Sequence, residues 1–422
     1  MKKLSLVITL LLCLLVLVSS CSAPIAADLP LSGDLMANIR AVEKPAAPAE
    51  PDSTYVNSIG TFSWKLFQES VKKDGNVLIS PTSVYLALGM VLNGADTTTR
   101  TAMLNALSAQ NLTVDQINSA SRDWMTLLMD TGDKTKLSIV NSIWLRDGFD
   151  ADQKFLQQNA DYYSAAARTL DFAKPEAIST INEWVKNATN NKIDKIIDEI
   201  RPDVIMYLIN AVHFKAEWQN QFEPLVTADG QFSTPGGEKT VQYMHQLTVM
   251  DYLNSEDGAG VLMPYSDGRF AFAAFLPAEN KSRDAVNAMD AAAFAKLLAS
   301  RQSLSVQLSL PKFETSFEAS LVDALSNMAM GEAFDPAAAD LSLMNSGRRK
   351  DLYIGDVKHK TYCRIDEAGT EAAAVTSVEI RETSMPESDI ELDFNRPFIY
   401  GIIDTVTGLP LFLGIMDDPT AE

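Results

Sequence analysis

Residues able to perform catalysis or hold a metal ion are few in this sequence. Its 422 residues include three histidines and three cysteines: His213, His245, His359, Cys13, Cys21 and Cys363. Three histidines cannot build a histidine-rich metal cage, and three cysteines cannot supply a four-cysteine zinc site or a disulfide scaffold. The sequence patterns of hydrolases, zinc metalloproteases, phosphate-binding loops and dinucleotide-binding folds are missing.

Each histidine is better explained as a structural hydrogen-bonding residue than as a catalyst. Counting alone leaves a serine–histidine–aspartate triad open, because the members of a triad can lie far apart in a sequence. We nevertheless expect no catalytic residue, no metal site, no cofactor and no enzymatic activity.

The segment from 367 to 381 has the residue types of a strand that could enter a sheet. As a strand it places small or apolar side chains on one face: Thr370, Ala372, Ala374, Thr376, Val378 and Ile380. The other face, expected to meet solvent, carries Glu371, Ala373, Val375, Ser377, Glu379 and Arg381. Small inward residues would enter a formed sheet without clashes, although the alanines also suit a short helix. Glu382 would be the next inward residue, and because a buried unpaired carboxylate is costly, the insertable stretch should stop near Arg381.

The elements around this segment follow two periodicities. Apolar residues at helical spacing predict helices over 59–71, which Gly75 ends, and over 178–185. Ser80 and Pro81 mark the start of a further helix, since serine can cap it and proline suits its first turn, and it continues to Asn93. Strand-like runs occupy 137–145, 204–215, 270–276 and 304–310, with three short ones within 390–416. Helices dominate early and strands late, which predicts an α+β fold.

Residues 1–20 have the pattern of an export signal. Lys2 and Lys3 precede an almost continuous apolar run over 6–18, and Ser19 and Ser20 lead into Cys21. The run is too short to span a bilayer permanently. Residues 18–21 resemble the lipobox of bacterial lipoproteins, which implies a lipid-modified Cys21 at the mature N-terminus. The alternative is an ordinary cleaved signal in which the cysteine occurs by chance.

The predicted organisation has four parts. After the leader 1–20, residues 21–54 comprise the lipidated cysteine and a stretch rich in proline and alanine, which predicts an extended tether. Residues 55–418 form one large domain, and 419–422 form a short tail. We therefore expect the protein outside the cytoplasm, either lipid-anchored to a bacterial cell envelope or secreted. It would meet the membrane only through its N-terminal lipid.

The net charge restricts the partners. Asp and Glu number 55 against 35 Lys and Arg, so the formal net charge is −20. An acidic chain repels a phosphate backbone, and the longest basic run is only Arg348–Lys350. We therefore expect no nucleic-acid partner. The charge bears on solubility and does not identify a target.

Four separate motifs resemble the serpin family of serine protease inhibitors, and the likeness covers residues 55–418. Residues 76–83 resemble the start of an early helix of that family, and residues 210–218 resemble its N-x-x-x-F-K-x-x-W strand. Residues 366–374 are similar to the hinge of its reactive-centre loop. Residues 394–414 resemble its C-terminal signature. The motifs follow the family's order, which chance does not explain.

The resemblance implies a serpin fold, with about nine helices around three β-sheets and an exposed reactive-centre loop. It also implies a monomeric suicide inhibitor of serine proteases, with cysteine proteases as further targets. In that mechanism the protease cleaves the loop, becomes acylated, and is trapped when the hinge inserts into the central sheet. The hinge comprises Glu367, Gly369, Thr370, Glu371, Ala372, Ala373, Ala374, Val375 and Thr376. The alternative is a non-inhibitory serpin that acts as a surface binding module.

By the same resemblance, the cluster that controls opening of the sheet comprises Ser80, Ser83, Asn210, His359 and Trp218, and the first four form a polar cluster beneath the strands that open. Such a buried network needs full hydrogen bonding and could keep the sheet closed until insertion repacks it. Trp218 and Thr370 fall near the top of the sheet, where insertion would begin.

The family's usual spacing from Gly369 places the scissile bond at Thr383–Ser384. The loop from Gly369 to Phe394 is about three residues longer than in familiar members, so Arg381–Glu382 is the alternative bond. Thr383 would suit elastase-like or subtilisin-like serine proteases with small apolar pockets. Arg381 would suit trypsin-like proteases, which we place second.

Overall fold

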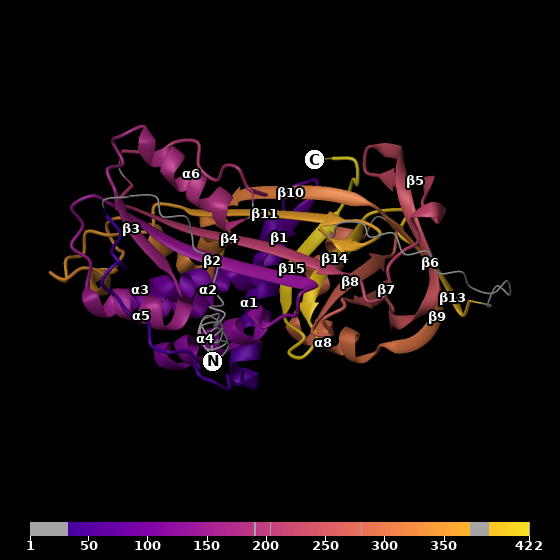
Figure 1. Ribbon diagram of the computed structural model, residues 1–422, viewed down its shortest axis with the longest axis horizontal. Helices are drawn as coiled ribbons and strands as arrows, with labels where there is room; N and C mark the ends of the chain where they lie inside the picture. Colours follow the sequence, from indigo (N-terminus) through magenta and orange to yellow (C-terminus); the bar gives the residue numbers. More distant parts are fainter. Residues whose placement is uncertain (1–32, 190, 203, 280, 372–387, 422) are drawn as a thin grey trace, which may run out of the picture. The chain divides into compact units, whose positions relative to one another are not determined.

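The computed structural model describes residues 33–421 except 190, 203, 280 and 372–387. Its helices and strands are drawn in Figure 1. The α-helices are α1 (Ser53–Ser70), α2 (Pro81–Leu92), α3 (Thr97–Ala106), α4 (Val114–Met129), α5 (Gln153–Tyr163), α6 (Glu176–Ala188), α7 (Ser282–Ala288), α8 (Ala291–Ala299) and α9 (Val322–Leu325). The strands are β1 (Val77–Ile79), β2 (Thr135–Arg146), β3 (Ala166–Leu170), β4 (Met206–Glu217), β5 (Ala228–Thr234), β6 (Gly237–Ser255), β7 (Gly258–Pro264), β8 (Phe270–Pro277), β9 (Gln302–Pro311), β10 (Phe313–Ser320), β11 (Val357–Ile365), β12 (Gly369–Thr370), β13 (Ile390–Asp393), β14 (Phe398–Asp404) and β15 (Pro410–Met416).

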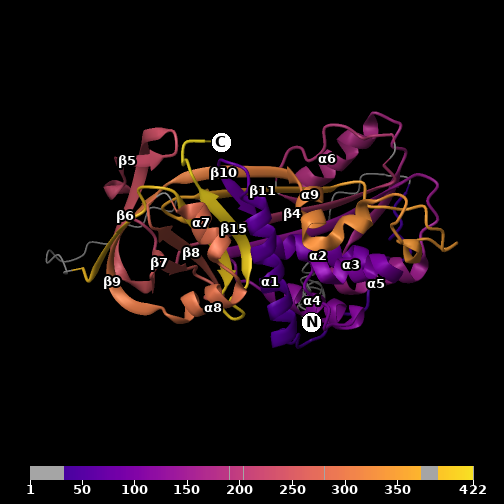
Figure 2. The same ribbon diagram turned by 180° about the vertical axis from the view of Figure 1, so that it is seen from behind.

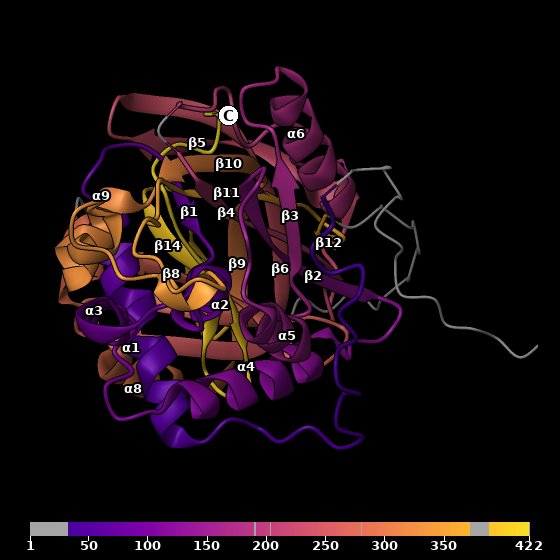
Figure 3. The same cartoon turned by 90° about the vertical axis from the view of Figure 1, so that its left-hand side faces the viewer.

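A six-stranded sheet carries the loop hinge. Its order is β10-β11-β12-β4-β2-β3, and the long strands β2 and β4 pair antiparallel through most of their length. Helix α6 covers one face (Figure 3). There, Trp184 packs edge-on against Trp144 of β2 with ring centroids 5.9 Å apart. Helices α2 and α4 pack on the opposite face. Apolar side chains are therefore buried on both faces of the sheet.

The remaining strands form a second sheet around the core. Its order is β1-β15-β14-β8-β7-β6-β9-β13, with β5 paired to β6. Every residue of β8, β14 and β15 is buried. Figure 2 shows β15, β8, β7, β6 and β9 of this sheet from the back of the molecule. Strand β6, 19 residues long, pairs with β5 near its start and with β7 near its end, so it joins two strand sets into one hydrogen-bonded sheet.

The elements agree with the periodicities of the sequence, and the predicted α+β class is confirmed. The runs 137–145, 270–276 and 304–310 lie within β2, β8 and β9, the run 204–215 begins two residues before β4, and the three C-terminal runs are β13, β14 and β15. The first helix begins earlier than the apolar pattern indicated. Asp52 caps it there by accepting a hydrogen bond from Tyr55 N at 2.9 Å.

Helix α2 is enclosed on all sides, and its start differs from the prediction. Its twelve residues are all buried, and Pro81 occupies the first turn as expected. Ser80 stands at the N-cap, but its side chain makes no capping hydrogen bond. Its backbone N–H instead donates to His359 Nε2 at 3.0 Å. The start of α2 is thus joined to β11, and Ser83 is held close to β4.

Residues 33–39 of the predicted tether pack against the domain, so they are not the extended spacer that the composition predicted. Leu35 N donates to Ala167 O at 3.0 Å and Thr169 N donates to Gly33 O at 2.8 Å, beside the edge strand β3. Gly33 has a φ of +126°, and a Cβ there would lie 2.4 Å from Thr169 O. Leu35, Met36 and Ile39 also pack on the hydrophobic core. Prolines indicate that a segment forms no regular helix or strand, but a segment without regular structure can still pack closely on a domain.

Candidate functional site

Strands β4 and β11 are neighbours along part of their length and then separate. They pair in parallel from Val357–Leu208 to Lys360–Ala211. Beyond that point β12 lies between them and pairs antiparallel with both. Thr370 of β12 is opposite Ile365 of β11 and Ala216 of β4. The hinge has therefore already started a new strand in the middle of the sheet.

Gly369 and Thr370 fit this position. A Cβ on Gly369, whose φ is +155°, would lie 2.0 Å from Ala216 O, so only glycine is accommodated. Thr370 is 1% exposed, and its hydroxyl lies 2.5 Å from Tyr265 Oη. Burial raises the pKa of Tyr265 well above its ordinary value, so the phenol stays protonated and can donate to Thr370.

Glu371 does not face solvent, which corrects the strand alternation proposed from the sequence. Its side chain is 3% exposed, and its carboxylate lies 2.6 Å from His213 Nε2 of β4 and 3.7 Å from Lys192 Nζ. With a φ of +52°, Glu371 leaves the strand in a left-handed conformation that costs about 1–2 kcal/mol in an L-residue. Further insertion therefore requires Glu371 to change its backbone conformation. The predicted alternation of side chains between two faces assumes an extended backbone, so it cannot reveal the left-handed turn at Glu371.

Residues 366–369, the hinge turn, lead β11 into β12. Asp366 Oδ1 accepts hydrogen bonds from Ala368 N at 3.0 Å and Gly369 N at 3.3 Å. Trp218 N donates to Ala368 O and Trp218 Nε1 donates to Asp366 O, both at 2.9 Å. The indole stacks on Tyr265, with ring centroids 4.7 Å apart and planes 9° from parallel. Trp218 thus fixes the hinge turn from just beyond the end of β4 and is not part of the polar cluster.

Glu367 is held by Lys312, a partner that sequence reasoning missed. Lys312 Nζ lies 2.9 Å from the Glu367 carboxylate, and Thr227 Oγ1 donates to it at 2.8 Å. Burial opposes ionisation, but the hydrogen bonds from Lys312 and Thr227 outweigh it and lower the pKa of Glu367. Phe222 N also donates to Glu367 O at 3.0 Å. The first hinge residue is consequently anchored by both its side chain and its backbone.

The structure brings together the four residues of the predicted polar cluster. Ser80 N donates to His359 Nε2, and Ser83 Oγ donates to Asn210 Oδ1 and lies 3.0 Å from Ser80 O. Asn210 and His359 are opposite each other across β4 and β11. The cluster therefore lies where the two strands still pair, nearer the start of both strands than the inserted hinge.

Asn141 extends this cluster, and the sequence prediction omitted it. Asn210 Nδ2 donates to Asn141 Oδ1 at 2.7 Å, which carries the network from β4 to β2. Thr361 Oγ1 of β11 donates to Leu78 O of β1 at 2.7 Å. The sequence feature that could have identified Asn141 is its amide side chain within the apolar run 137–145.

The remaining predicted site residues lie outside the described residues. They are Ala372, Ala373, Ala374, Val375 and Thr376 of the hinge, both candidate bonds, Thr383–Ser384 and Arg381–Glu382, and Cys21. The chain returns near β13, where Asp389 N donates to Ser305 O at 2.8 Å. Among the residues described, no group of three or more His, Cys, Asp or Glu side chains could hold a metal ion. Within the same residues, no helix is long and apolar enough to cross a bilayer.

The charge state of His359 should make stability depend on pH. Burial lowers the pKa of His359 from 6.5 to about 4. Between these values the unfolded chain binds a proton that the folded protein does not. The contribution of the neutral His359 to the free energy of unfolding is therefore fully present above pH 6.5, and it is lost as the pH is lowered toward 4. We expect His359 to account for a loss of about 3 kcal/mol across this interval.

Urea unfolding of the wild type and of His359→Gln across this pH range measures the effect. The glutamine carbonyl can still accept from Ser80 N but binds no proton, so the variant should lose less stability on acidification. Parallel pH dependences for the two proteins would contradict a neutral His359 in the folded state.

Comparison with known proteins agrees with this geometry. The family model described as serpin (serine protease inhibitor) matches residues 57–419. An uncharacterized serpin-like protein of Thermococcus kodakarensis is 31% identical over 368 residues, covering 86% of this chain and 85% of the relative. Alpha-1-antiproteinase 2 of Equus caballus is 29% identical over 375 residues, covering 86% and 87% respectively.

A solved structure confirms the fold predicted from the sequence. The thermophilic serpin tengpin in its native state matches with a TM-score of 0.86 and 35% identity, covering 92% of this chain and 100% of that chain. Its latent state matches with a TM-score of 0.77 and 34% identity, covering 87% and 98%. Serpins in general inhibit proteases and are not themselves enzymes. The chain belongs to the serpin family.

Proposed function

We propose that this serpin traps serine proteases as acyl-enzymes by inserting its reactive-centre loop between β4 and β11. The observation that carries this proposal is the position of β12. Thr370 already pairs with both neighbouring strands and Gly369 pairs with β4, so the hinge has the register and direction of an inserted strand. Continuing that register places Glu371 opposite Lys215 of β4 and Ala372 opposite Phe214.

The covalent step uses the nucleophile of the protease. Its hydroxyl oxygen attacks the scissile carbonyl carbon, the C–N bond breaks, and the new amine takes the proton from the catalytic base. The residues before the bond remain on the protease as an ester. Insertion of the freed hinge then draws the protease away before water can hydrolyse that ester.

The backbone of the separated strands favours insertion. In the described chain the direct pairing of β4 and β11 ends at Ala211 and Lys360. An inserted strand would supply hydrogen-bond partners to residues 212–215 and 361–364, each bond contributing about 1 kcal/mol. Ala372, Ala374 and Thr376 are small enough to follow Thr370 on the inward face.

The expected target is a serine protease, with cysteine proteases as further candidates. Cleavage at Thr383–Ser384 favours elastase-like or subtilisin-like proteases. Cleavage at Arg381–Glu382 favours trypsin-like proteases, although an acidic residue directly after the bond suits them poorly. The inhibitor is proposed to act as a monomer.

Substitution of Thr370 by arginine should turn the inhibitor into a substrate. The side chain is 1% exposed against Tyr265, so a large cation there opposes insertion and gives hydrolysis of the ester time to occur. We expect the number of inhibitor molecules consumed per trapped protease to rise about tenfold, the ratio that corresponds to about 1.4 kcal/mol. Detergent-resistant complexes with elastase, subtilisin and trypsin measure this ratio on denaturing gels.

The matched control is Thr370→Ser, which keeps a small hydroxyl side chain and should retain the wild-type ratio. An unchanged ratio in Thr370→Arg would contradict insertion along this register. If every protease cleaves the wild-type loop and is released, the non-inhibitory binding module becomes the better account. Mass spectrometry of the C-terminal fragment locates the bond. A fragment that begins at Ser384 supports the first assignment, and one that begins at Glu382 replaces it.

We also propose that the mature chain is lipid-modified at Cys21 and held outside the bacterial cytoplasm. The charged start, apolar run and small residues before Cys21 support this proposal. Expressed with its leader in a bacterial host, the wild type should partition into a detergent phase, whereas Cys21→Ser should not. Equal partitioning of the two proteins would contradict lipid attachment at this cysteine.

A further inference from the structure

Two lysines stand directly opposite each other on one face of the six-stranded sheet. Lys136 of β2 is the cross-strand neighbour of Lys215 of β4, where the two strands run side by side (Figure 1). Like charges in this position repel each other. The next acid along this face of β4, Glu217, is paired with Lys134 at 3.1 Å. Among the residues described, neither Lys136 nor Lys215 has an ion pair, so the face carries two uncompensated positive charges.

These lysines lie where the next hinge residue would enter. Thr370 is opposite Ala216, so the continued antiparallel register places Glu371 opposite Lys215. Because Thr370 faces the core, the side chain of Glu371 would fall on the other face, which is that of the lysines. Opposite charges on directly facing residues stabilise a sheet. An entered Glu371 would therefore pair with Lys215 and offset its repulsion with Lys136.

Glu371 is held at a different place on this face in the intact protein. Its carboxylate lies 2.6 Å from His213 Nε2 and 3.7 Å from Lys192 Nζ. A carboxylate only accepts hydrogen bonds, so His213 Nε2 is the donor. The continued register assigns the position opposite His213 to Ala373. The Glu371 side chain thus occupies a place that must be vacated before the small alanine can enter.

The backbone of Glu371 has reached its final partner on one side only. Its N–H donates to Arg364 O of β11 at 3.1 Å, as the register with β11 requires. The chain then turns out of the sheet, because Glu371 has a φ of +52°. A return to extended backbone would remove this unfavourable conformation and carry the carboxylate from His213 toward Lys215.

Cations flank the receiving position on both neighbouring strands. Lys215 lies on the β4 side, and Arg364 is opposite Glu371 on the β11 side. Asp366 lies 3.3 Å from Arg364 and is its ion-pair partner in the intact protein. Lys215, without such a partner in the described chain, is therefore the stronger attraction for the entering carboxylate.

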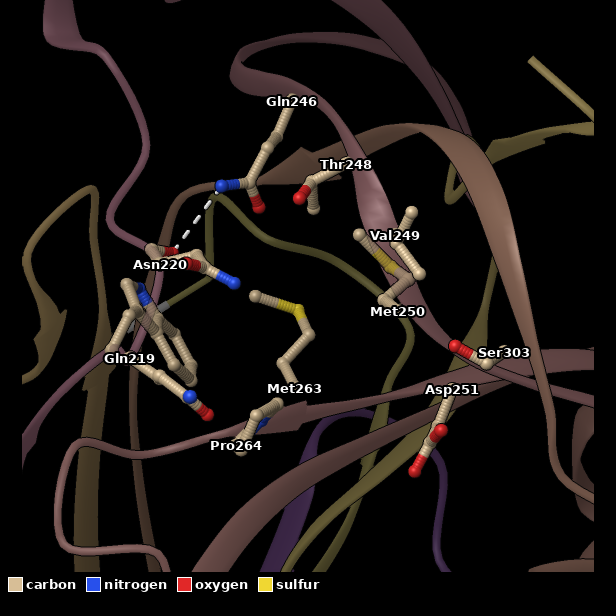
Figure 4. A pocket seen from close by; sticks show the side chains of 11 residues that line it. Gln219, Asn220, Gln246, Thr248, Val249, Met250, Asp251, Met263, Pro264 and Ser303 are labelled. Atoms are coloured by element: carbon tan, nitrogen blue, oxygen red, sulfur yellow. Dashed lines mark hydrogen bonds between the residues drawn. The ribbon is translucent and has the colours of Figure 1, made fainter.

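The open depression beyond the end of β4 offers Glu371 no other cation (Figure 4). Trp218, which fixes the hinge turn, lines it together with uncharged polar side chains such as that of Gln246. Asp251 is the one charged residue of the lining in the described chain, and it lies 3.6 Å from Arg301. The basic partners of an entering hinge are consequently those on the sheet.

We propose that insertion transfers Glu371 from His213 and Lys192 to Lys215, and that these three residues are positioning residues for the hinge. His213 and Lys192 hold the hinge where only its first residues have entered. Lys215 receives the carboxylate when the strand continues. This transfer rests on the proposed function, since Glu371 moves to Lys215 only if the cleaved loop enters the sheet.

The difference between the unfolding midpoints of the loop-cleaved and the intact protein tests this transfer. Lys215→Gln removes the receiving cation and should lower the midpoint of the cleaved protein by about 1–2 °C. The same change should leave the intact protein unchanged or slightly more stable, because the repulsion with Lys136 is lost. The difference between the two midpoints should therefore become smaller.

His213→Leu removes the contact that holds Glu371 in the intact protein. The intact protein should lose about 1–2 °C or more and the cleaved protein less, so the difference should become larger. Lys154→Gln is the matched control for the loss of a lysine. It changes an exposed residue of α5 that has no ion pair among the residues described, and both midpoints should stay at their wild-type values. Lys215→Gln decides the question if His213→Leu does not fold.

Glu371→Gln shows whether both effects arise from this carboxylate. In the Glu371→Gln background, Lys215→Gln and His213→Leu should change the difference clearly less than they do in the wild type. A difference that Lys215→Gln leaves unchanged, or changes equally in both backgrounds, would overturn the transfer while loop insertion stands. A wild type whose cleaved form is no more stable than the intact form would contradict insertion itself, and the transfer with it.

Discussion

The separation of β4 and β11 by β12 is the constraint on which the rest of this structure depends. Two neighbouring strands of a buried sheet pair directly over one stretch and admit Gly369 and Thr370 over another. Backbone N–H and C=O groups inside a protein need partners, so such an arrangement must be supported from both ends. The polar cluster supports the paired stretch, and the hinge turn supports the separated one.

The two supports differ in their physical character. The polar cluster connects β11, β4, β2 and the start of α2 through uncharged hydrogen bonds, including the buried, neutral His359. The hinge turn is fixed by the ion pair of Glu367 with Lys312 and by the stacked rings of Trp218 and Tyr265. Glu371, bound to His213, marks where the chain leaves the sheet. Cys363 of β11 is a free cysteine, so this strand has no disulfide that would restrain it.

Much of the fold could be predicted from the sequence because it follows from local periodicity. The apolar runs that form β2, β4, β8 and β9 alternate or continue as buried strands must, and Pro81 starts α2. The predictions failed where tertiary contacts override local pattern. Glu371 is buried because His213 and Lys192 approach it from elsewhere in the chain. The segment that starts at Gly33 packs because Ala167 and Thr169 offer it backbone partners, which composition cannot show.

The central claim, that the loop inserts between β4 and β11 after cleavage, is tested most directly by thermal unfolding of the intact and loop-cleaved protein. An added strand that gains about ten backbone hydrogen bonds should raise the unfolding midpoint by roughly 10 °C or more. Cleavage by a protease that releases the product, with the fragment masses verified, provides the sample. A cleaved protein that unfolds at a clearly higher temperature than the intact one is the predicted result. A cleaved protein that unfolds at the same temperature or lower would contradict insertion.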